Sequence, residues 1–318
     1  MKILVYGVGP IGALAIHYLC MADNDVTVVA RSTYDELKTN GIVIEHYIQK
    51  KKTVDHPTIV KEADTTVNYD IVFSIMQGQQ QKPLLDTFCK LNTKLIVLVG
   101  NNMEADYCEQ YIQEHKVSER HVVFAFQNSA GRRENSKVIC GRLPTTPIDV
   151  GGLHSKADSK DIELIRKAFN TKGVKINEMD EMYGFYFCHV AEVMPYCYVC
   201  YKNDYNLKKA SSKEIKMIMK ATKECFDYLK SCNITIMPPK EDEYYKENGF
   251  KPKAMYSLYR IMGKTFLGPL MVSDHCKNGI KEMKYLDEKF NEYRMNNPGP
   301  DMPTWDEMRE WSKTAFNI

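Results

Sequence analysis

Hydrophobic positions follow two different patterns in the two halves of the chain. In the first half, short runs of apolar and mostly β-branched residues predict strands buried on both faces, at 2–6, 25–30, 70–75, 94–99 and 121–126. Amphipathic segments between these runs predict helices at 11–21, 83–89 and 104–115. Strands and helices that alternate at these lengths indicate βαβ units, and therefore an α/β domain with a doubly wound sheet.

Weaker alternation over residues 41–60 predicts an antiparallel insertion into this domain, to which 137–140 and 146–150 are also assigned. A helix over 158–170 and a strand over 174–177 are expected to close the domain. After Asp180 the strand pattern stops, and helical patterns follow at 181–202, 211–232, 254–267, 277–293 and 304–316. We therefore predict an α/β domain over residues 1–178 and an all-helical domain over residues 179–318.

Composition narrows the classes of partner. The 318 residues include 43 Lys and Arg and 41 Asp and Glu, so the net charge is close to zero. The chain therefore has no overall positive potential that would attract nucleic acid or an anionic membrane. The longest apolar stretch, residues 183–201, contains His189, Glu192 and Pro195, so we expect no membrane span. The ten cysteines are scattered, and residues 1–6 lead directly into a glycine loop without room for a signal peptide. We expect a cytoplasmic protein without nucleic-acid or membrane partners, and leave a homodimer open.

The strongest motif is Gly7-Val8-Gly9-Pro10-Ile11-Gly12, a G-x-G-x-x-G sequence that follows a predicted strand and opens a predicted helix. Gly7 allows a tight turn, Gly9 lets the backbone approach a pyrophosphate, and Gly12 allows close packing of helix on strand. Backbone N–H groups at the helix start then face the phosphates. The other interpretation is a glycine-rich turn in an unrelated α/β fold. The spacing favours dinucleotide binding and a Rossmann-like domain.

The end of the second predicted strand indicates which dinucleotide binds. Proteins that bind NAD place an acidic residue there for the ribose 2′-hydroxyl. Here Arg31 and Ser32 follow the strand, and no carboxylate occurs until Asp35. Because a guanidinium suits a 2′-phosphate, we predict NADP(H) as the cofactor, with a surface arginine as the alternative interpretation.

Further motifs extend a resemblance over most of the chain. They are the glycine loop with Arg31, then DIVFSIM at 70–76, LVGNNM at 98–103, FCHVAEVMP at 187–195 and the 275–283 segment. Together they resemble the ketopantoate reductase (2-dehydropantoate 2-reductase) family. The resemblance implies NADPH-dependent reduction of a small 2-oxo acid or related ketone to the alcohol. It also implies that Gly7, Gly9, Gly12 and Arg31 bind NADP(H) and that Asn101 lies near the nicotinamide and the substrate.

Two lysines of the family pattern are missing. The position of the family's first-domain lysine falls at Met76 or Gln77, which the resemblance places at the cofactor. The family's catalytic lysine, on the first helix of the second domain, falls at Tyr186 or Phe187, and residues 176–201 contain no lysine. The chain therefore resembles a divergent branch of the family without the catalytic lysine.

Another side chain must then protonate the alkoxide that hydride delivery leaves. His189 is the best candidate, with Glu192 at i+3 to orient it and stabilise its charge, and with Tyr186 one turn earlier. The alternative is a core histidine beside a surface glutamate. His275 and Glu282 could contribute from a late helix, although a solvated helix face explains them as well.

Three functions remain open at this stage. They are a reductase of a 2-oxo acid or ketone, a catalytically altered NADP(H)-binding protein with a sensing or regulatory role, and a dehydrogenase that works in the oxidative direction. No histidine or cysteine spacing indicates a metal site, and we interpret Cys197 and Cys200 as core residues. Arg132 and Arg133 could meet an anion or form a basic turn.

Overall fold

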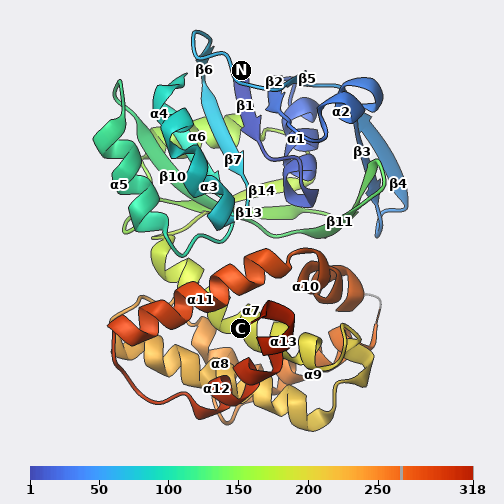
Figure 1. Cartoon of the computed structure of the whole chain (residues 1–318), viewed down its shortest axis with the longest axis vertical. Helices are drawn as coiled ribbons and strands as arrows, with labels where there is room; N and C mark the ends of the chain where they lie inside the picture. Colours follow the sequence, from blue (N-terminus) through green and yellow to red (C-terminus); the bar gives the residue numbers. More distant parts are fainter. Residues whose placement is uncertain (266–267, 318) are drawn as a thin grey trace. The chain divides into compact units, whose positions relative to one another are not determined.

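The chain folds into two units, Met1–Met182 and Tyr183–Ile318, in the computed structural model, which describes residues 1–265 and 268–317 (Figure 1). The boundary predicted between residues 178 and 179 falls at the end of the last strand. Residues 266–267, the end of the helix predicted over 254–267, lie outside the described residues.

An eight-stranded sheet forms the centre of the N-terminal unit. Its strands, in spatial order, are β14 (Val174–Glu178), β13 (Thr146–Gly151), β10 (His121–Gln127), β9 (Leu95–Val99), β7 (Ile71–Ile75), β1 (Lys2–Tyr6), β2 (Asp25–Val29) and β5 (Thr58–Val60). From β5 to β10 all neighbours are parallel, and β13 pairs antiparallel with β10. The order β5-β2-β1-β7-β9-β10 corresponds to 3-2-1-4-5-6, the order of doubly wound dinucleotide-binding sheets.

The strands predicted from apolar runs are confirmed, and their burial explains the pattern. Every residue of β7 and β9 is buried, as are residues 3–6 of β1. A strand buried on both faces needs no polar alternation, so an unbroken β-branched run is stable there. Helices supply the cover, and α1 packs along β1 and β2. The predicted fold class, a Rossmann-like α/β domain followed by a helical region, is confirmed.

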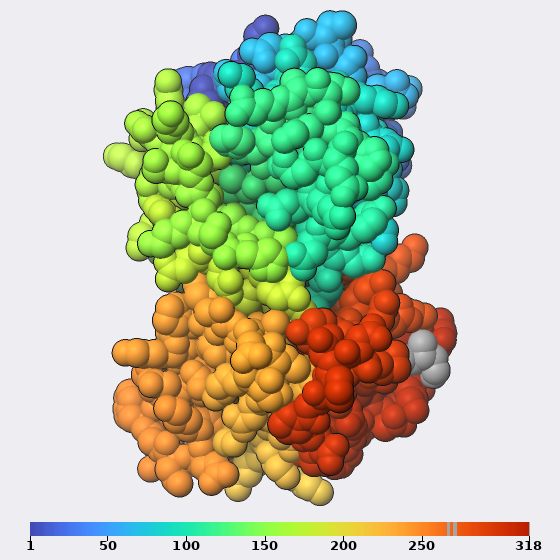
Figure 2. All heavy atoms as spheres, turned by 90° about the vertical axis from the view of Figure 1, so that its left-hand side faces the viewer, coloured from blue at the N-terminus to red at the C-terminus, as the bar shows by residue number. Residues whose placement is uncertain are grey.

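Six α-helices and one 3₁₀ turn belong to this unit. They are α1 (Pro10–Met21), α2 (Tyr34–Asn40), α3 (Gly78–Gln81), η1 (Lys82–Leu84), α4 (Leu85–Lys90), α5 (Ala105–His115) and α6 (Ser159–Ala168). The sequence did not predict α2 and α3, because each is short and mostly polar. Figure 2 shows the face of this unit on which α5 and α6 form much of the surface, in green and yellow-green.

A second, four-stranded sheet corrects the predicted insertion. It has the order β11 (Ala130–Glu134), β12 (Lys137–Gly141), β3 (Ile42–His46) and β4 (Lys51–Asp55). β3 and β4 are antiparallel as expected, but residues 58–60 and 146–151 join the main sheet instead. Alternation alone shows that a strand has one covered face, and it does not show which sheet the strand joins. The small sheet packs against α1, and β6 (Asn68–Tyr69) pairs separately with β8 (Asn92–Thr93).

The described part of residues 183–318 contains helices and turns and no strand. The elements are α7 (Tyr183–Lys202), η2 (Leu207–Lys209), α8 (Ser212–Ser231), η3 (Glu241–Tyr245), α9 (Phe250–Lys264), the π-helical turn η4 (Pro269–Ser273), α10 (Asp274–Asn278), α11 (Ile280–Asn296), α12 (Pro303–Arg309), η5 (Glu310–Ser312) and α13 (Lys313–Phe316). α7 is apolar around most of its circumference, so it is buried among α8, α11 and α12. None of the described helices is long and apolar enough to cross a bilayer.

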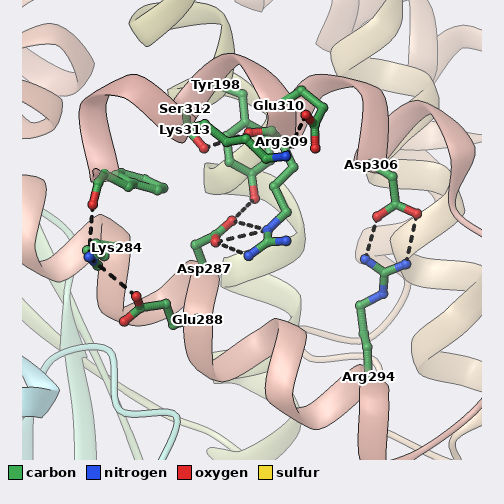
Figure 3. Close-up of polar contacts among 11 residues, drawn as sticks. Tyr198, Lys284, Asp287, Glu288, Arg294, Asp306, Arg309, Glu310, Ser312 and Lys313 are labelled. Carbon is green, nitrogen blue, oxygen red and sulfur yellow. Dashed lines mark hydrogen bonds and ion pairs between the residues drawn. The ribbon is translucent and has the colours of Figure 1, made fainter. Parts of the chain in front are cut away.

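One buried ion pair joins three elements of this unit. Asp287 of α11, only 2% exposed, accepts hydrogen bonds from Tyr198 of α7 at 2.6 Å and from Arg309 of α12 at 2.9 and 3.0 Å (Figure 3). A buried carboxylate is stable only when its oxygens are paired in this way. The network therefore fixes α11 and α12 against α7.

Candidate functional site

Six parallel strands end at one edge of the main sheet, and the predicted cofactor residues lie in the loops that follow four of them. Gly7 follows β1, Met76 follows β7, Asn101 follows β9, and Arg31 follows β2 after one residue. The strand order reverses between β1 and β7, which are neighbours. Ligands of open α/β sheets bind beyond the carboxyl ends of the strands at such a reversal. The structure thus brings these residues together at the edge where a dinucleotide would lie.

Two glycines of the loop are required by packing. Gly7 has φ of +100°, and a Cβ there would lie 2.1 Å from the Ile75 carbonyl oxygen. A Cβ on Gly12 would lie 2.1 Å from the carbonyl oxygen of Gly7. Both contacts are with backbone atoms, which cannot move aside. The first glycine therefore permits the turn from β1 toward α1 beside the end of β7, and the last permits α1 to pack against this turn.

Gly9 differs from the other two. It is exposed, has φ of −67°, and a Cβ on it would have no described atom within 4 Å. Pro10 is the first residue of α1, and among the described residues no side chain caps this helix and no acidic residue lies in its first turn. The helix start therefore presents N–H groups and a positive dipole end toward open space, which suits the phosphates of a nucleotide.

Arg31 is exposed and lies between β2 and α2, and Ser32 beside it is also exposed. Its charge acts on Tyr6 at the end of β1. Burial raises the pKa of Tyr6 to about 12, and Arg31 opposes this rise. The charge of Arg31 therefore acts at the carboxyl end of β1 as well as at that of β2.

Met76 and Gln77 occupy the loop between β7 and α3, both partly exposed. The Met76 Cγ atom lies so close to Gly7 that a Cβ on Gly7 would be 2.9 Å from it. The next lysine along the chain, Lys82, is paired with Glu104 at 2.8 Å. Met76 and Gln77 can therefore offer packing and neutral polar contacts at this edge, but no charge.

Two buried amides, which no sequence pattern indicated, hold the loops of this edge. Gln81 is fully buried and donates hydrogen bonds to the carbonyl oxygens of Met76 at 3.1 Å and Val99 at 3.2 Å. Asn102 donates to the Gln81 side chain at 3.0 Å and accepts from the Glu104 backbone at 2.9 Å. These bonds join residues up to 21 positions apart, so no local pattern could have revealed them.

The buried side chain of Asn101 indicates whether a nicotinamide nucleotide fits this edge of the sheet. The residue follows Gly100, which has φ of +129°, and its side chain is 5% exposed. Within the described residues its Oδ1 atom has no hydrogen-bond partner. A buried amide oxygen without a donor is costly unless a ligand supplies one. A carboxamide N–H or a ribose hydroxyl would be such a donor, so the residues present fit the proposed cofactor.

The catalytic candidates of the second unit lie on α7. Tyr186 is fully buried, whereas His189 is partly exposed and stacks on Phe185, with ring centroids 6.3 Å apart. Burial and the nearby His275 lower the pKa of His189 to about 4. The imidazole is therefore neutral at pH 7, a form that can accept a proton.

Glu192 contacts a different group of residues. Tyr245 of η3 donates a hydrogen bond to it at 3.2 Å, and Tyr259 lies 2.9 Å from Tyr245. Burial and the carboxyl group of Glu241, to which Glu192 is hydrogen-bonded, raise the pKa of Glu192 well above its ordinary value. This environment disfavours the carboxylate form, which the expected role requires. The expected role of Glu192, an anion that keeps His189 charged, therefore does not follow from the structure.

His275 and Glu282, for which a role in the site and a solvated helix face were both left open, contact each other. Their Nε2 and Oε2 atoms lie 3.5 Å apart, and Glu282 is buried. His275 is thus a neighbour that lowers the pKa of His189, the opposite of the effect expected from Glu192. Over residues 1–265 and 268–317, no group of three or more His, Cys, Asp or Glu side chains has an arrangement that could hold a metal ion.

Comparison with known proteins agrees with this arrangement. Residues 3–144 match the family model described as ketopantoate reductase PanE/ApbA. This segment contains the glycine loop, Arg31, Met76, Gln77 and Asn101. No curated protein matches the chain in sequence.

Solved structures extend the similarity beyond that segment. A D-mandelate dehydrogenase in complex with NADH and anilino(oxo)acetate has a TM-score of 0.69 at 15% identity, with 100% of both chains covered. A 2-dehydropantoate 2-reductase from Methylococcus capsulatus has a TM-score of 0.68 at 14% identity, covering 99% of this chain and 96% of that one. A PanE/ApbA family ketopantoate reductase from Ralstonia eutropha has a TM-score of 0.69 at 13% identity, covering 100% and 99%. Residues 3–144 are therefore similar to the ketopantoate reductase family, and the whole chain shares the fold of these solved proteins.

Proposed function

We propose that the chain is a nicotinamide-dependent oxidoreductase that interconverts a small 2-oxo acid, or a related ketone, and its alcohol, with NADP(H) as its cofactor. The observation that carries the proposal is the edge of the main sheet at β1 and β7. There the open side of Gly9 and the buried Oδ1 of Asn101 provide a place for phosphates and a place for a nicotinamide. The family match and the substrates named for the solved relatives support the same reaction class.

In this proposal each residue has a separate task. The N–H groups at the start of α1 bind the pyrophosphate, and Arg31 with Ser32 binds the 2′-phosphate. NADPH, when bound, supplies the hydride. Asn101 orients the carboxamide or ribose, and the imidazole of His189 holds the proton that the new alkoxide needs. An anionic 2-oxo acid next to His189 would raise its pKa, because an opposite charge favours the protonated ring.

The state of His189 favours a second candidate, a dehydrogenase that works in the oxidative direction. Oxidation of a 2-hydroxy acid requires a base that removes the hydroxyl proton. With a pKa lowered to about 4, His189 is available as that base at neutral pH. The two candidates use the same residues and differ in which protonation state of His189 begins the reaction.

The cofactor assignment can be tested by titration. We expect NADPH to bind at least tenfold more tightly than NADH, a difference of about 1.4 kcal/mol, because Arg31 takes the place of the acidic residue of NAD-binding proteins. Arg31→Ala should bring the two affinities close together. Isothermal titration calorimetry with both nucleotides measures this ratio.

Lys38→Ala is a suitable control for loss of charge, since Lys38 lies on α2 and contacts the Tyr34 hydroxyl at 3.0 Å. It should leave the ratio unchanged. Equal affinities of the unaltered protein for NADPH and NADH would refute the assignment of NADP(H).

A further inference from the structure

A segment distant in sequence is packed on the glycine loop. Gln127, at the end of β10 and 3% exposed, donates a hydrogen bond to the Ile11 carbonyl oxygen at 3.1 Å. A Cβ on Gly131 of β11 would lie 3.0 Å from the Pro10 Cβ atom. Arg133 of β11 donates to the Val8 carbonyl oxygen at 2.6 Å. The loop proposed to bind phosphate is therefore contacted by β10 and β11 at three successive points.

Arg133 also reaches the element that follows β2. Its Nη1 atom lies 3.5 Å from Glu36 Oε1, and both side chains are partly exposed, by 28% and 33%. Glu36 belongs to the first turn of α2, which begins three residues after Arg31. The guanidinium thus lies between the glycine loop and the turn in which Arg31 is placed.

This position is the one an adenosine ribose takes in a Rossmann-like site, between the glycine loop and the end of the second strand. A guanidinium carries five N–H donors in a planar fork that matches phosphate. Within the described ranges, Arg133 gives one short bond to Val8 and one long contact to Glu36. At 3.5 Å the contact with Glu36 exceeds the ~2.7–2.9 Å typical of a well-formed charge-assisted bond, so a phosphate oxygen can replace it.

We infer that Arg133 is a second cation for the nucleotide 2′-phosphate, acting with Arg31, and that Glu36 holds its guanidinium when no phosphate is present. The inference rests on the proposed function, since it names a residue that sets cofactor specificity at the same site. Glu36 should weaken binding of the 2′-phosphate, because the Glu36 carboxylate competes with the phosphate for Arg133. The preference for NADP(H) then depends on three charged residues from three elements.

The test uses two probes without nicotinamide, adenosine 2′,5′-bisphosphate and 5′-AMP, each titrated by calorimetry. Arg133→Ala should weaken the bisphosphate about tenfold or more and change 5′-AMP by less than about threefold, as expected for one lost charge-assisted bond. Glu36→Gln should tighten the bisphosphate several-fold. Arg132→Ala is the matched control, because Arg132 points to the other face of β11 and pairs with Glu134 at 3.4 Å.

Thermal unfolding of each variant separates binding from folding. If Arg133→Ala does not fold, two other variants decide the question. Arg133→Lys should lose part of the affinity for the bisphosphate, and Glu36→Gln should gain affinity for it. An equal loss for both probes in the Arg133 variants would show that the residue only supports the loop, and would overturn the inference while leaving the proposed function intact. If the unaltered protein binds neither probe nor NADPH, the proposed function fails together with the inference.

Discussion

Replacement of Gly9 by valine is expected to abolish nucleotide binding and to leave the fold intact. Gly9 has φ of −67° and ψ of −177°, a backbone conformation that valine readily adopts, and the space around its Cβ position is open. The branched side chain would fill the space through which the pyrophosphate must approach the helix start. Affinity for NADPH should fall by about a hundredfold or more, while circular dichroism and the unfolding temperature remain close to those of the unaltered protein.

Gly12→Val provides the contrast within the same loop. A Cβ on Gly12 would lie 2.1 Å from the Gly7 carbonyl oxygen, so this substitution should destabilise the protein itself. Loss of binding with an intact fold in Gly9→Val, and loss of stability in Gly12→Val, would distinguish a ligand site from a packing site. If Gly9→Val binds NADPH with nearly normal affinity, the glycine loop is not the phosphate site.

The second large effect is expected from replacing His189, the side chain proposed to transfer the proton. For any substrate that the protein turns over, His189→Ala should lower kcat by about 10²–10⁴-fold, the usual contribution of a general acid or base. Affinity for NADPH should remain nearly unchanged, because the residues proposed to bind the cofactor belong to the N-terminal unit. Turnover at the unaltered rate would make His189 a packing residue, and Tyr186→Phe would then be the next variant to measure.

The pH dependence of this reaction has a definite sign. If His189 donates the proton, as proposed, reduction requires its protonated ring, and at a pKa of about 4 only about one ring in a thousand carries the proton at pH 7. For reduction, kcat/KM should therefore fall tenfold per pH unit above about pH 4, whereas oxidation should stay at its plateau. His275→Gln removes the neighbour that lowers this pKa, so it should shift both profiles to higher pH. Unshifted profiles would contradict the assignment of the proton to His189.

The fold was predictable from the sequence where each element carries its own signal. The apolar runs of β1, β7 and β9 identify buried strands, and the G-x-G-x-x-G spacing identifies the turn into α1. The sheet to which β5 and β13 belong was not predictable, since one-sided burial is the same in either sheet. Short polar helices such as α2 also lack a periodic pattern long enough to recognise.

The candidate site was predictable only in part, for a similar reason. The glycine loop and Arg31 lie within one βαβ unit, so their relation is local. Arg133 contacts Val8 across 125 positions, and Glu192 contacts Tyr245 across 53. Helical spacing placed Glu192 beside His189, but tertiary packing placed tyrosines and a second carboxyl group next to it. Contacts of this kind depend on packing that no periodicity encodes.

The central claim is that this chain transfers a hydride between a nicotinamide nucleotide and a small 2-oxo or 2-hydroxy acid. Its most direct test is nicotinamide absorbance, recorded with the unaltered protein and NADPH against a panel of 2-oxo acids, and with NADP⁺ against the matching 2-hydroxy acids. The account predicts turnover of at least one acid, faster with the phosphorylated nucleotide than with NADH or NAD⁺, and loss of that turnover in Gly9→Val. Binding of NADPH without turnover of any acid in either direction would contradict the claim, and would favour a nucleotide-binding protein with a sensing or regulatory role.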